Sequence, residues 1–181
     1  AIAARLLAVA TRCGLAAAVD DATLFPPALS QAGVRLDRLL IMPAQDAVGV
    51  ARAADILLRS HAFGIVLMPV IAVKSAVWSR LASLAHRANA LLVVLGPQAS
   101  TELGYCASAR VQCAIARVLW THNSGPFCEL AGYEIDAGVI KNKRAAPGMH
   151  ACIRVIAKKE GALRERSLVF SQKPPTKMVR V

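Results

Sequence analysis

The stretch FGIVLMPV (residues 63–70) decides the fold class of this chain. Phe63 to Met68 is an unbroken apolar run after a segment with helical periodicity, and such a run is typical of a strand buried on both faces. The run is followed by Pro69, which can neither ligate a metal nor donate a backbone hydrogen bond. A strand covered on both faces needs helices on either side, so residues 63–70 predict the middle of a parallel α/β sheet.

The segments on either side of this run alternate between helical and strand patterns. Asp20 and Asp21 stand where a short apolar stretch ends, and Asp46 stands where it can cap a helix. The expected helices are residues 2–13, 26–33, 46–59 and 74–90, and the expected strands are 15–19, 36–42, 63–68 and 91–95. This alternation indicates a parallel sheet with right-handed crossovers.

After Gly96 the pattern changes to a period of two, as in half-buried strands. The expected antiparallel strands are near residues 110–115, 132–143 and 150–157, with a turn at 122–127. Residues 158–181 contain many cations and Pro174-Pro175, which predicts a flexible tail. We therefore predict one core over residues 1–157, a mostly parallel sheet flanked by helices and extended by antiparallel strands, followed by the tail.

Positive charge gathers at the C-terminal end of the chain. The net charge is +11; residues 141–181 hold eleven Lys and Arg against two Asp and Glu, whereas residues 1–140 hold eleven against nine. A basic segment of this kind suits a polyanion, most simply DNA, and a purely solubilising tail fits the sequence equally well. The candidate DNA-binding cations are Lys141, Lys143, Arg144, Lys158, Lys159, Arg164, Arg166, Lys173, Lys177 and Arg180.

Other chemistry-bearing residues give few signals. The five cysteines form no C-x-x-C pair, and isolated cysteines in apolar strands are usually reduced core residues, which favours the cytoplasm, here with the nucleoid. The four histidines are scattered, so the sequence predicts no metal site and no cofactor. Trp78 and Trp120 are expected to be core or half-buried packing residues.

Three stretches resemble the core of the RecA recombinase family, and they occur in the family's order. They are AVDDATLFPPALSQAGVRLDRLLIMPA (18–44), ADILLRSHAFGIVLMPVIAV (54–73) and VIKNKRAAPG (139–148). The resemblance covers most of residues 1–157 and implies a RecA-like core. It also matches Lys141 and Lys143 to family lysines that reach a neighbouring subunit's nucleotide, so they are candidate phosphate or partner contacts. An ordinary solvated strand end fits them equally well.

The residues that this family uses for ATP hydrolysis are replaced. Pro69 stands where the family has a carboxylate that orders Mg²⁺, and Ala22 stands where a glutamate positions the attacking water. No glycine here is followed by lysine, so the phosphate-binding loop is absent from these residues; the chain begins with Ala1, so we expect further sequence upstream. Asp20 and Asp21 are interpreted as turn residues, with paired acid–base carboxylates as the alternative. The resemblance thus implies a RecA-like fold that is not an enzyme.

Among RecA-like proteins without ATPase residues, the chain looks more like the ImuA family than like SulA. The resemblance rests on LDRLL (36–40), ADILLRSHAF (54–63), WSRLASLAHRA (78–88) and LLVVLG (91–96). It implies an accessory role in SOS-induced translesion DNA synthesis and mutagenesis, with two partners: ImuB, a Y-family polymerase relative without catalysis, and an error-prone C-family DNA polymerase. Two alternatives stay open: a RecA-type ATPase whose phosphate-binding loop lies outside this chain, and a SulA-like inhibitor of the cell-division GTPase FtsZ.

The resemblance also indicates where a partner would bind. RecA subunits join when an N-terminal segment of one subunit adds to a sheet edge of the next, and the matching surface here is the strand 38–42 with the helix 46–59. An edge strand offers unpaired N–H and C=O groups to such a segment. The expected occupant is a short motif of ImuB; the chain's own upstream segment and self-association are the alternatives. The candidate partner-binding residues are Leu40, Ile41, Ile56 and Arg59.

Overall fold

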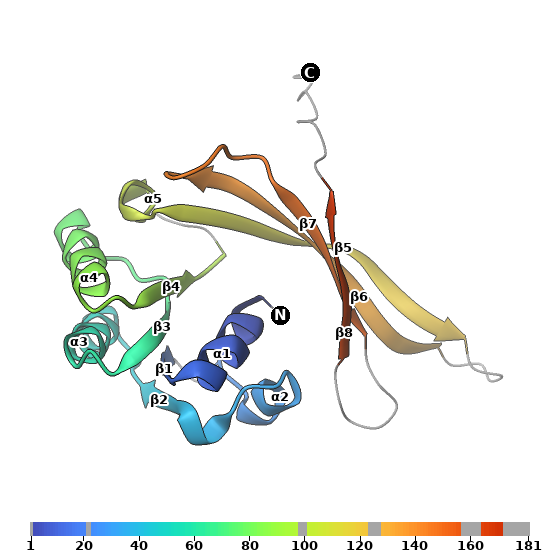
Figure 1. Ribbon diagram of the computed structural model, residues 1–181, viewed down its shortest axis with the longest axis horizontal. Helices are drawn as coiled ribbons and strands as arrows, with labels where there is room; N and C mark the ends of the chain where they lie inside the picture. Colours follow the sequence, from blue (N-terminus) through green and yellow to red (C-terminus); the bar gives the residue numbers. More distant parts are fainter. Residues whose placement is uncertain (1, 21–22, 98–100, 123–127, 157–163, 172–181) are drawn as a thin grey trace. The chain divides into compact units, whose positions relative to one another are not determined.

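The computed structural model describes all of the chain except residues 1, 21–22, 98–100, 123–127, 157–163 and 172–181. The chain divides into two units, Ala1–Ala107 and Ser108–Val181. The first unit holds the parallel sheet and the second holds the antiparallel strands (Figure 1). The predicted end of the core at residue 157 lies outside the described residues and stays a prediction.

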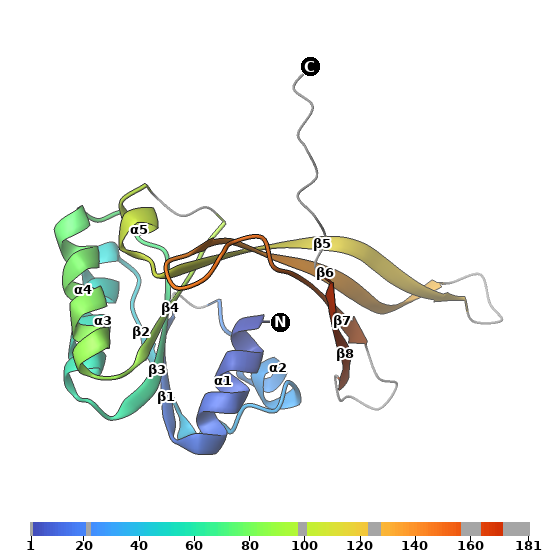
Figure 2. The same cartoon turned by 45° about the horizontal axis from the view of Figure 1, so that its top comes forward.

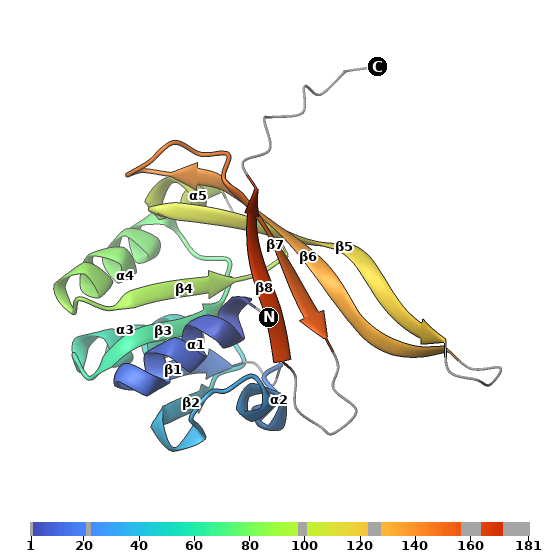
Figure 3. The ribbon, with the colours of Figure 1, turned by 45° about the vertical axis from the view of Figure 1, so that its right-hand side comes forward.

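The first unit alternates helices and strands. Its strands form a parallel sheet in the order β2-β1-β3-β4, which Figure 3 shows with the strands side by side. The predicted parallel α/β sheet is therefore confirmed. The helices are α1 (Ile2–Cys13), α2 (Pro26–Gln31), α3 (Ala47–Arg59), α4 (Ser75–Arg87) and α5 (Thr101–Cys106), and the strands are β1 (Leu15–Asp20), β2 (Leu39–Pro43), β3 (Phe63–Pro69) and β4 (Leu91–Leu95).

Helices cover both faces of this sheet, with α1 and α2 on one side and α3 and α4 on the other (Figure 2). Successive side chains of a strand point to opposite faces. Ala16 of β1 and Ile65 of β3 therefore pack with Leu7 of α1, whereas Ala17 and Val66 pack on the side of α3 and α4. Burial on both faces explains why the central strands read as continuous apolar runs.

One predicted strand begins later than expected, because a 3-10 turn occupies Leu36–Arg38. The backbone N–H of Arg38 donates to the carbonyl of Arg35 at 3.0 Å, and the Arg35 guanidinium pairs with Asp37 at 2.8 Å. The backbone N–H of Arg35 also donates to the buried hydroxyl of Thr11 at 3.1 Å. These bonds hold the turn, so the predicted strand 36–42 is corrected to β2, Leu39–Pro43.

The second unit is an antiparallel sheet in the order β5-β6-β7-β8. The predicted antiparallel strands are confirmed, but among the described residues they form a sheet of their own and do not extend the parallel one. The first two strands are longer than predicted, and most of the predicted turn at 122–127 lies outside the described residues. Residues 164–171 correct the predicted flexible tail, because they form a strand paired with β7. The strands are β5 (Ala109–His122), β6 (Cys128–Asn142), β7 (His150–Ile156) and β8 (Arg164–Ser171).

The burial of individual residues confirms one expectation and corrects two. Trp78 is 1% exposed, as expected, whereas Trp120 is 58% exposed on β5, a strand with exposed side chains along nearly its whole length. Four of the five cysteines are exposed and Cys106 is half-buried, so the prediction of core cysteines is wrong. No helix among the described residues is long and apolar enough to cross a membrane.

Candidate functional site

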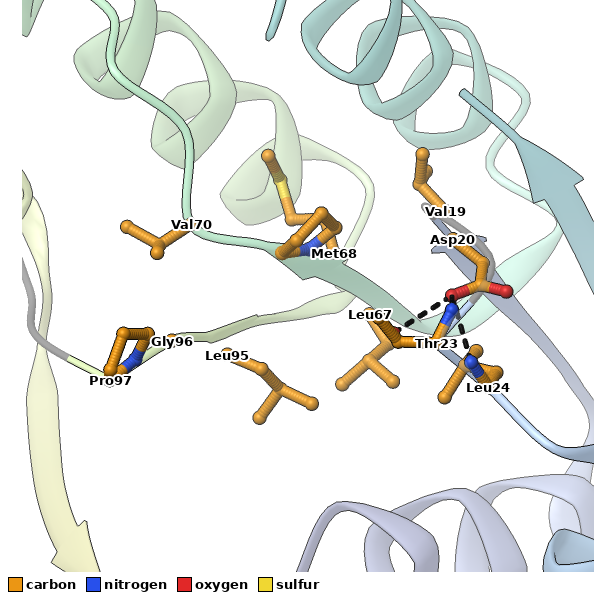
Figure 4. A pocket seen from close by; sticks show the side chains of 11 residues that line it. Val19, Asp20, Thr23, Leu24, Leu67, Met68, Val70, Leu95, Gly96 and Pro97 are labelled. Atoms are coloured by element: carbon orange, nitrogen blue, oxygen red, sulfur yellow. Dashed lines mark hydrogen bonds between the residues drawn. The ribbon is translucent and has the colours of Figure 1, made fainter. Parts of the chain in front are cut away.

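A cavity of about 310 Å³ opens at the carboxyl ends of β1, β3 and β4 (Figure 4). The chain leaves β1 for β2 on one side of the sheet, whereas β3 and β4 lie on the other side, so the strand order reverses between β1 and β3. In open parallel sheets this position is where ligands bind. The cavity is therefore the candidate ligand site of the first unit.

Among the described lining residues, the carboxylate belongs to Asp20, which is 8% exposed. Its Oδ1 atom accepts hydrogen bonds from the backbone N–H of Thr23 at 3.0 Å, from the Thr23 hydroxyl at 3.1 Å and from the backbone N–H of Leu24 at 3.0 Å (Figure 4). Three donors on one oxygen make this side chain the organiser of the turn after β1. The interpretation of Asp20 as a turn residue is confirmed, and Asp21 lies outside the described residues.

Of the two residues predicted to replace catalytic acids of the RecA family, the structure describes one. Pro69 is the last residue of β3; it lines the cavity, and its Cα partner in β4 is Leu95. The following residue, Val70, donates its backbone N–H to the carbonyl of Leu95 at 2.6 Å, so the two chains stay paired past Pro69. Ala22 lies outside the described residues.

The remaining wall of this cavity is largely apolar. Apart from Asp20 and Thr23 it is formed by Val19, Leu24, Leu67, Met68, Pro69, Val70, Leu95, Gly96 and Pro97. None of these described lining residues is cationic, and an anionic carboxylate repels a phosphate that no cation accompanies. The lining as described is thus better suited to an uncharged or cationic hydrogen-bond donor than to a bare phosphate chain. Elsewhere in the described parts of the chain, no three His, Cys, Asp or Glu side chains form a group that could hold a metal ion.

The predicted partner surface includes a strand at the edge of the parallel sheet. Among the described residues, β2 pairs only with β1, so one side of its backbone faces no other strand. Leu40 lies in the middle of β2, in register with Ala17, and is 43% exposed. The structure therefore places Leu40 on an edge strand, as a β-augmentation site requires.

The four candidate partner-binding residues do not all lie on one face. Leu39 of β2 packs with the α1 side of the core and Met42 packs with the α3 side. Because side chains alternate, Leu40 points to the side of α3 and Ile41 points to the side of α1. Ile56 of α3 is 61% exposed, and Arg59 pairs with Asp55 at 2.9 Å. Leu40, Ile56 and Arg59 thus belong to one side of the sheet and Ile41 belongs to the other.

The candidate DNA-binding cations are only partly described. Lys141 lies on β6, Lys143 and Arg144 follow the end of that strand, and the backbone N–H of Lys143 donates to the carbonyl of Ser108 at 2.9 Å. Arg164 and Arg166 lie on β8. The others, Lys158, Lys159, Lys173, Lys177 and Arg180, lie outside the described residues.

One cation near this group was missed from the sequence. Arg110 of β5 is the cross-strand partner of Lys141, so the two like charges stand opposite each other in the antiparallel pair. Like charges directly opposite each other are unfavourable in a sheet. Residues 110 and 141 are thirty-one positions apart, so only the register of the strands brings them together.

The comparisons with known proteins leave the family of this chain open. No known family model matches the chain, and no curated protein matches it in sequence. Among solved structures, the chain is similar to SulA from Pseudomonas aeruginosa, with 20% sequence identity and a TM-score of 0.46. The match covers 51% of this chain and 82% of that chain.

Proposed function

We propose that this chain is a non-catalytic, RecA-like accessory protein of the ImuA kind, acting in SOS-induced translesion DNA synthesis. One observation carries the proposal: at the carboxyl edge of the parallel sheet, β3 ends in Pro69, and the neighbouring carboxylate of Asp20 is engaged in the turn after β1. Proline offers no ligand for Mg²⁺, so phosphoryl transfer here would lack a carboxylate that the family uses. The sequence resemblance supports the assignment to this family, and the replaced residues support the proposal that the chain has no catalytic activity.

The partner contact in this proposal is made by β2 and α3. A short extended motif of ImuB adds to the outer side of β2, and its apolar side chains pack near Leu40 and Ile56. Support comes from the edge position of β2 and from the exposure of these two side chains, 43% and 61%. The error-prone C-family polymerase joins this complex, and the basic C-terminal residues attract DNA without sequence preference.

A pull-down of ImuB by the full chain tests the proposed contact. A glutamate at either Leu40 or Ile56 places a charge in the apolar part of the contact, so Leu40→Glu and Ile56→Glu are expected to weaken ImuB binding at least tenfold. Val9→Glu is the matched control, because Val9 is a 62% exposed valine on α1, on the opposite face of the sheet. Undiminished binding by both folded variants would place the contact elsewhere.

The SulA-like alternative has its own measurement. FtsZ is polymerised with GTP and sedimented with and without the full chain. Our proposal predicts the same amount of pelleted FtsZ in both samples, because in this proposal the surface formed by β2 and α3 binds ImuB and not FtsZ. Loss of pelleted FtsZ in proportion to the added chain would replace the proposed function with the inhibitor.

A further inference from the structure

A second cavity, of about 290 Å³, lies between the C-terminal ends of α3 and α4. Its described lining residues are Arg59, His61, Leu84 and Arg87, so three of four carry or can acquire a positive charge. Helix α3 leads into β3 and α4 leads into β4, so this cavity lies at the amino ends of those strands. The cavity beside Asp20 is at the opposite, carboxyl end of the sheet.

An aspartate shared by two arginines sets the charge beside this cavity. The Nε atom of Arg80 lies 2.7 Å from Asp55 Oδ1, and the Nε atom of Arg59 lies 2.9 Å from Asp55 Oδ2. One negative charge thus serves two guanidinium groups. In the described part of the chain, Arg87 makes no hydrogen bond or ion pair, and it is exposed.

The negative ends of the two helix dipoles do not cancel the positive charge that the arginines keep after pairing with Asp55. Arg59 and Arg87 stand in the last turns of α3 and α4, where each helix dipole contributes about half a negative charge. Three arginines, one aspartate and two such helix ends leave about one positive charge. The cavity is therefore positive.

The backbone of His61 adds an independent observation. His61 follows the end of α3 with φ of +56°, a left-handed conformation that usually belongs to glycine or asparagine at this place. The corresponding residue after α4 is Asn89, with φ of +50°. Histidine at such a position is less favourable than glycine, and it places an imidazole in the cavity wall.

We propose that this cavity binds a phosphate group, either of a nucleic-acid backbone or of a free phosphorylated molecule. The planar guanidinium groups of Arg59 and Arg87 suit phosphate oxygens, and the ring N–H of His61 adds a further donor. A volume of 290 Å³ is at the lower end for ligand pockets, so it fits one phosphate group better than a whole nucleotide. The site uses none of the basic C-terminal residues, but it shares Arg59 of α3 with the candidate partner surface.

The test measures binding of a labelled single-stranded oligonucleotide to the full chain by fluorescence anisotropy at several salt concentrations. Arg87→Gln is expected to weaken binding about fivefold and to lower the magnitude of the salt slope by about 1. Asp55→Asn removes the shared negative charge, so it is expected to tighten binding. Arg12→Gln is the matched control: it removes an exposed arginine from the last turn of α1, on the other face of the sheet, and is expected to change affinity less than twofold.

Amide resonances then separate the two sources of phosphate. Inorganic phosphate and the oligonucleotide are titrated separately while the backbone amides of His61, Ala62 and Asn89 are followed by NMR. Shifts with both titrants assign the cavity to phosphate as such, and shifts with the oligonucleotide alone assign it to a nucleic-acid backbone. Equal weakening by Arg87→Gln and Arg12→Gln, or amides that move with neither titrant, would overturn the proposal.

Discussion

Asp20 and Thr23 are joined by two hydrogen bonds, because Oδ1 of Asp20 accepts from both the backbone N–H and the hydroxyl of Thr23, at 3.0 and 3.1 Å. The same oxygen accepts from the backbone N–H of Leu24 at 3.0 Å. A single carboxylate thereby fixes the chain where β1 ends and the candidate cavity begins. In this arrangement Asp20 acts on the backbone of its own turn.

Removal of the Asp20 carboxylate is expected to destabilise the chain. Asp20→Ala leaves two backbone N–H groups without their acceptor, and the expected loss is about 1–2 kcal/mol in the free energy of unfolding. Asp20→Asn keeps one acceptor oxygen and is expected to lose less. Urea denaturation measures both variants. If Asp20→Ala unfolds at the same urea concentration as the unaltered chain, the turn does not need the carboxylate, and Asp20 is then available as a metal ligand or base.

The stability contributed by Asp55 is expected to depend on pH. The hydrogen bond from Arg80 holds the pKa of the Asp55 carboxyl below its usual value, and the charge of Arg59 acts in the same direction against the effect of burial. A carboxyl whose pKa is lowered by folding stabilises the fold above its unfolded pKa, about 3.9, and this contribution is lost as pH falls through the folded pKa. The difference in unfolding free energy between the unaltered chain and Asp55→Asn should therefore be full at pH 7 and shrink below about pH 4. A difference that stays constant down to pH 2 would show that the ion pairs do not carry it.

The basic C-terminal end is expected to supply salt-dependent, sequence-independent DNA affinity. Because β8 pairs with β7, the informative truncation begins after it and removes residues 172–181 with Lys173, Lys177 and Arg180. If these three cations neutralise phosphates, the slope of log affinity against log salt for single-stranded DNA should fall in magnitude by about 2. A triple glutamine variant of the same residues keeps the length and is expected to behave like the truncation. If both variants keep the DNA affinity and the salt slope of the unaltered chain, the positive charge of residues 172–181 only keeps the chain in solution.

The sequence predicts the parallel sheet well because its strands are buried on both faces. Residues 65–68 of β3 and residues 16–20 of β1 are buried without interruption, so their composition alone marks them as strands. The cap by Asp46 is equally local, with the N–H of Gly49 donating to its side chain at 3.2 Å. Such features depend on residues close together in the chain.

Structural features that depend on residues far apart in the chain could not be predicted from the sequence. The turn at Leu36–Arg38 is held partly by Thr11, and β8 is a strand because β7 lies beside it, although cations within it suggest a tail. Two residues of the candidate site, Pro69 and Asp20, could be predicted from the sequence, because each stands at the end of a predicted strand. The pairing of Arg110 with Lys141 and the cavity between α3 and α4 require the register and the helix packing.

The measurement that tests the central claim most directly is steady-state ATP hydrolysis by a homogeneous preparation of the chain together with any upstream residues, with and without single-stranded DNA. The proposed resemblance puts Pro69 and Ala22 at the positions of two acids that the RecA family uses, so the account predicts turnover at the buffer background in both conditions. A preparation of Asp20→Asn serves as the control for a contaminating ATPase, since a contaminant is indifferent to this substitution. DNA-stimulated turnover that Asp20→Asn abolishes would contradict the account, because it would place a working hydrolytic site at the carboxyl edge of the sheet.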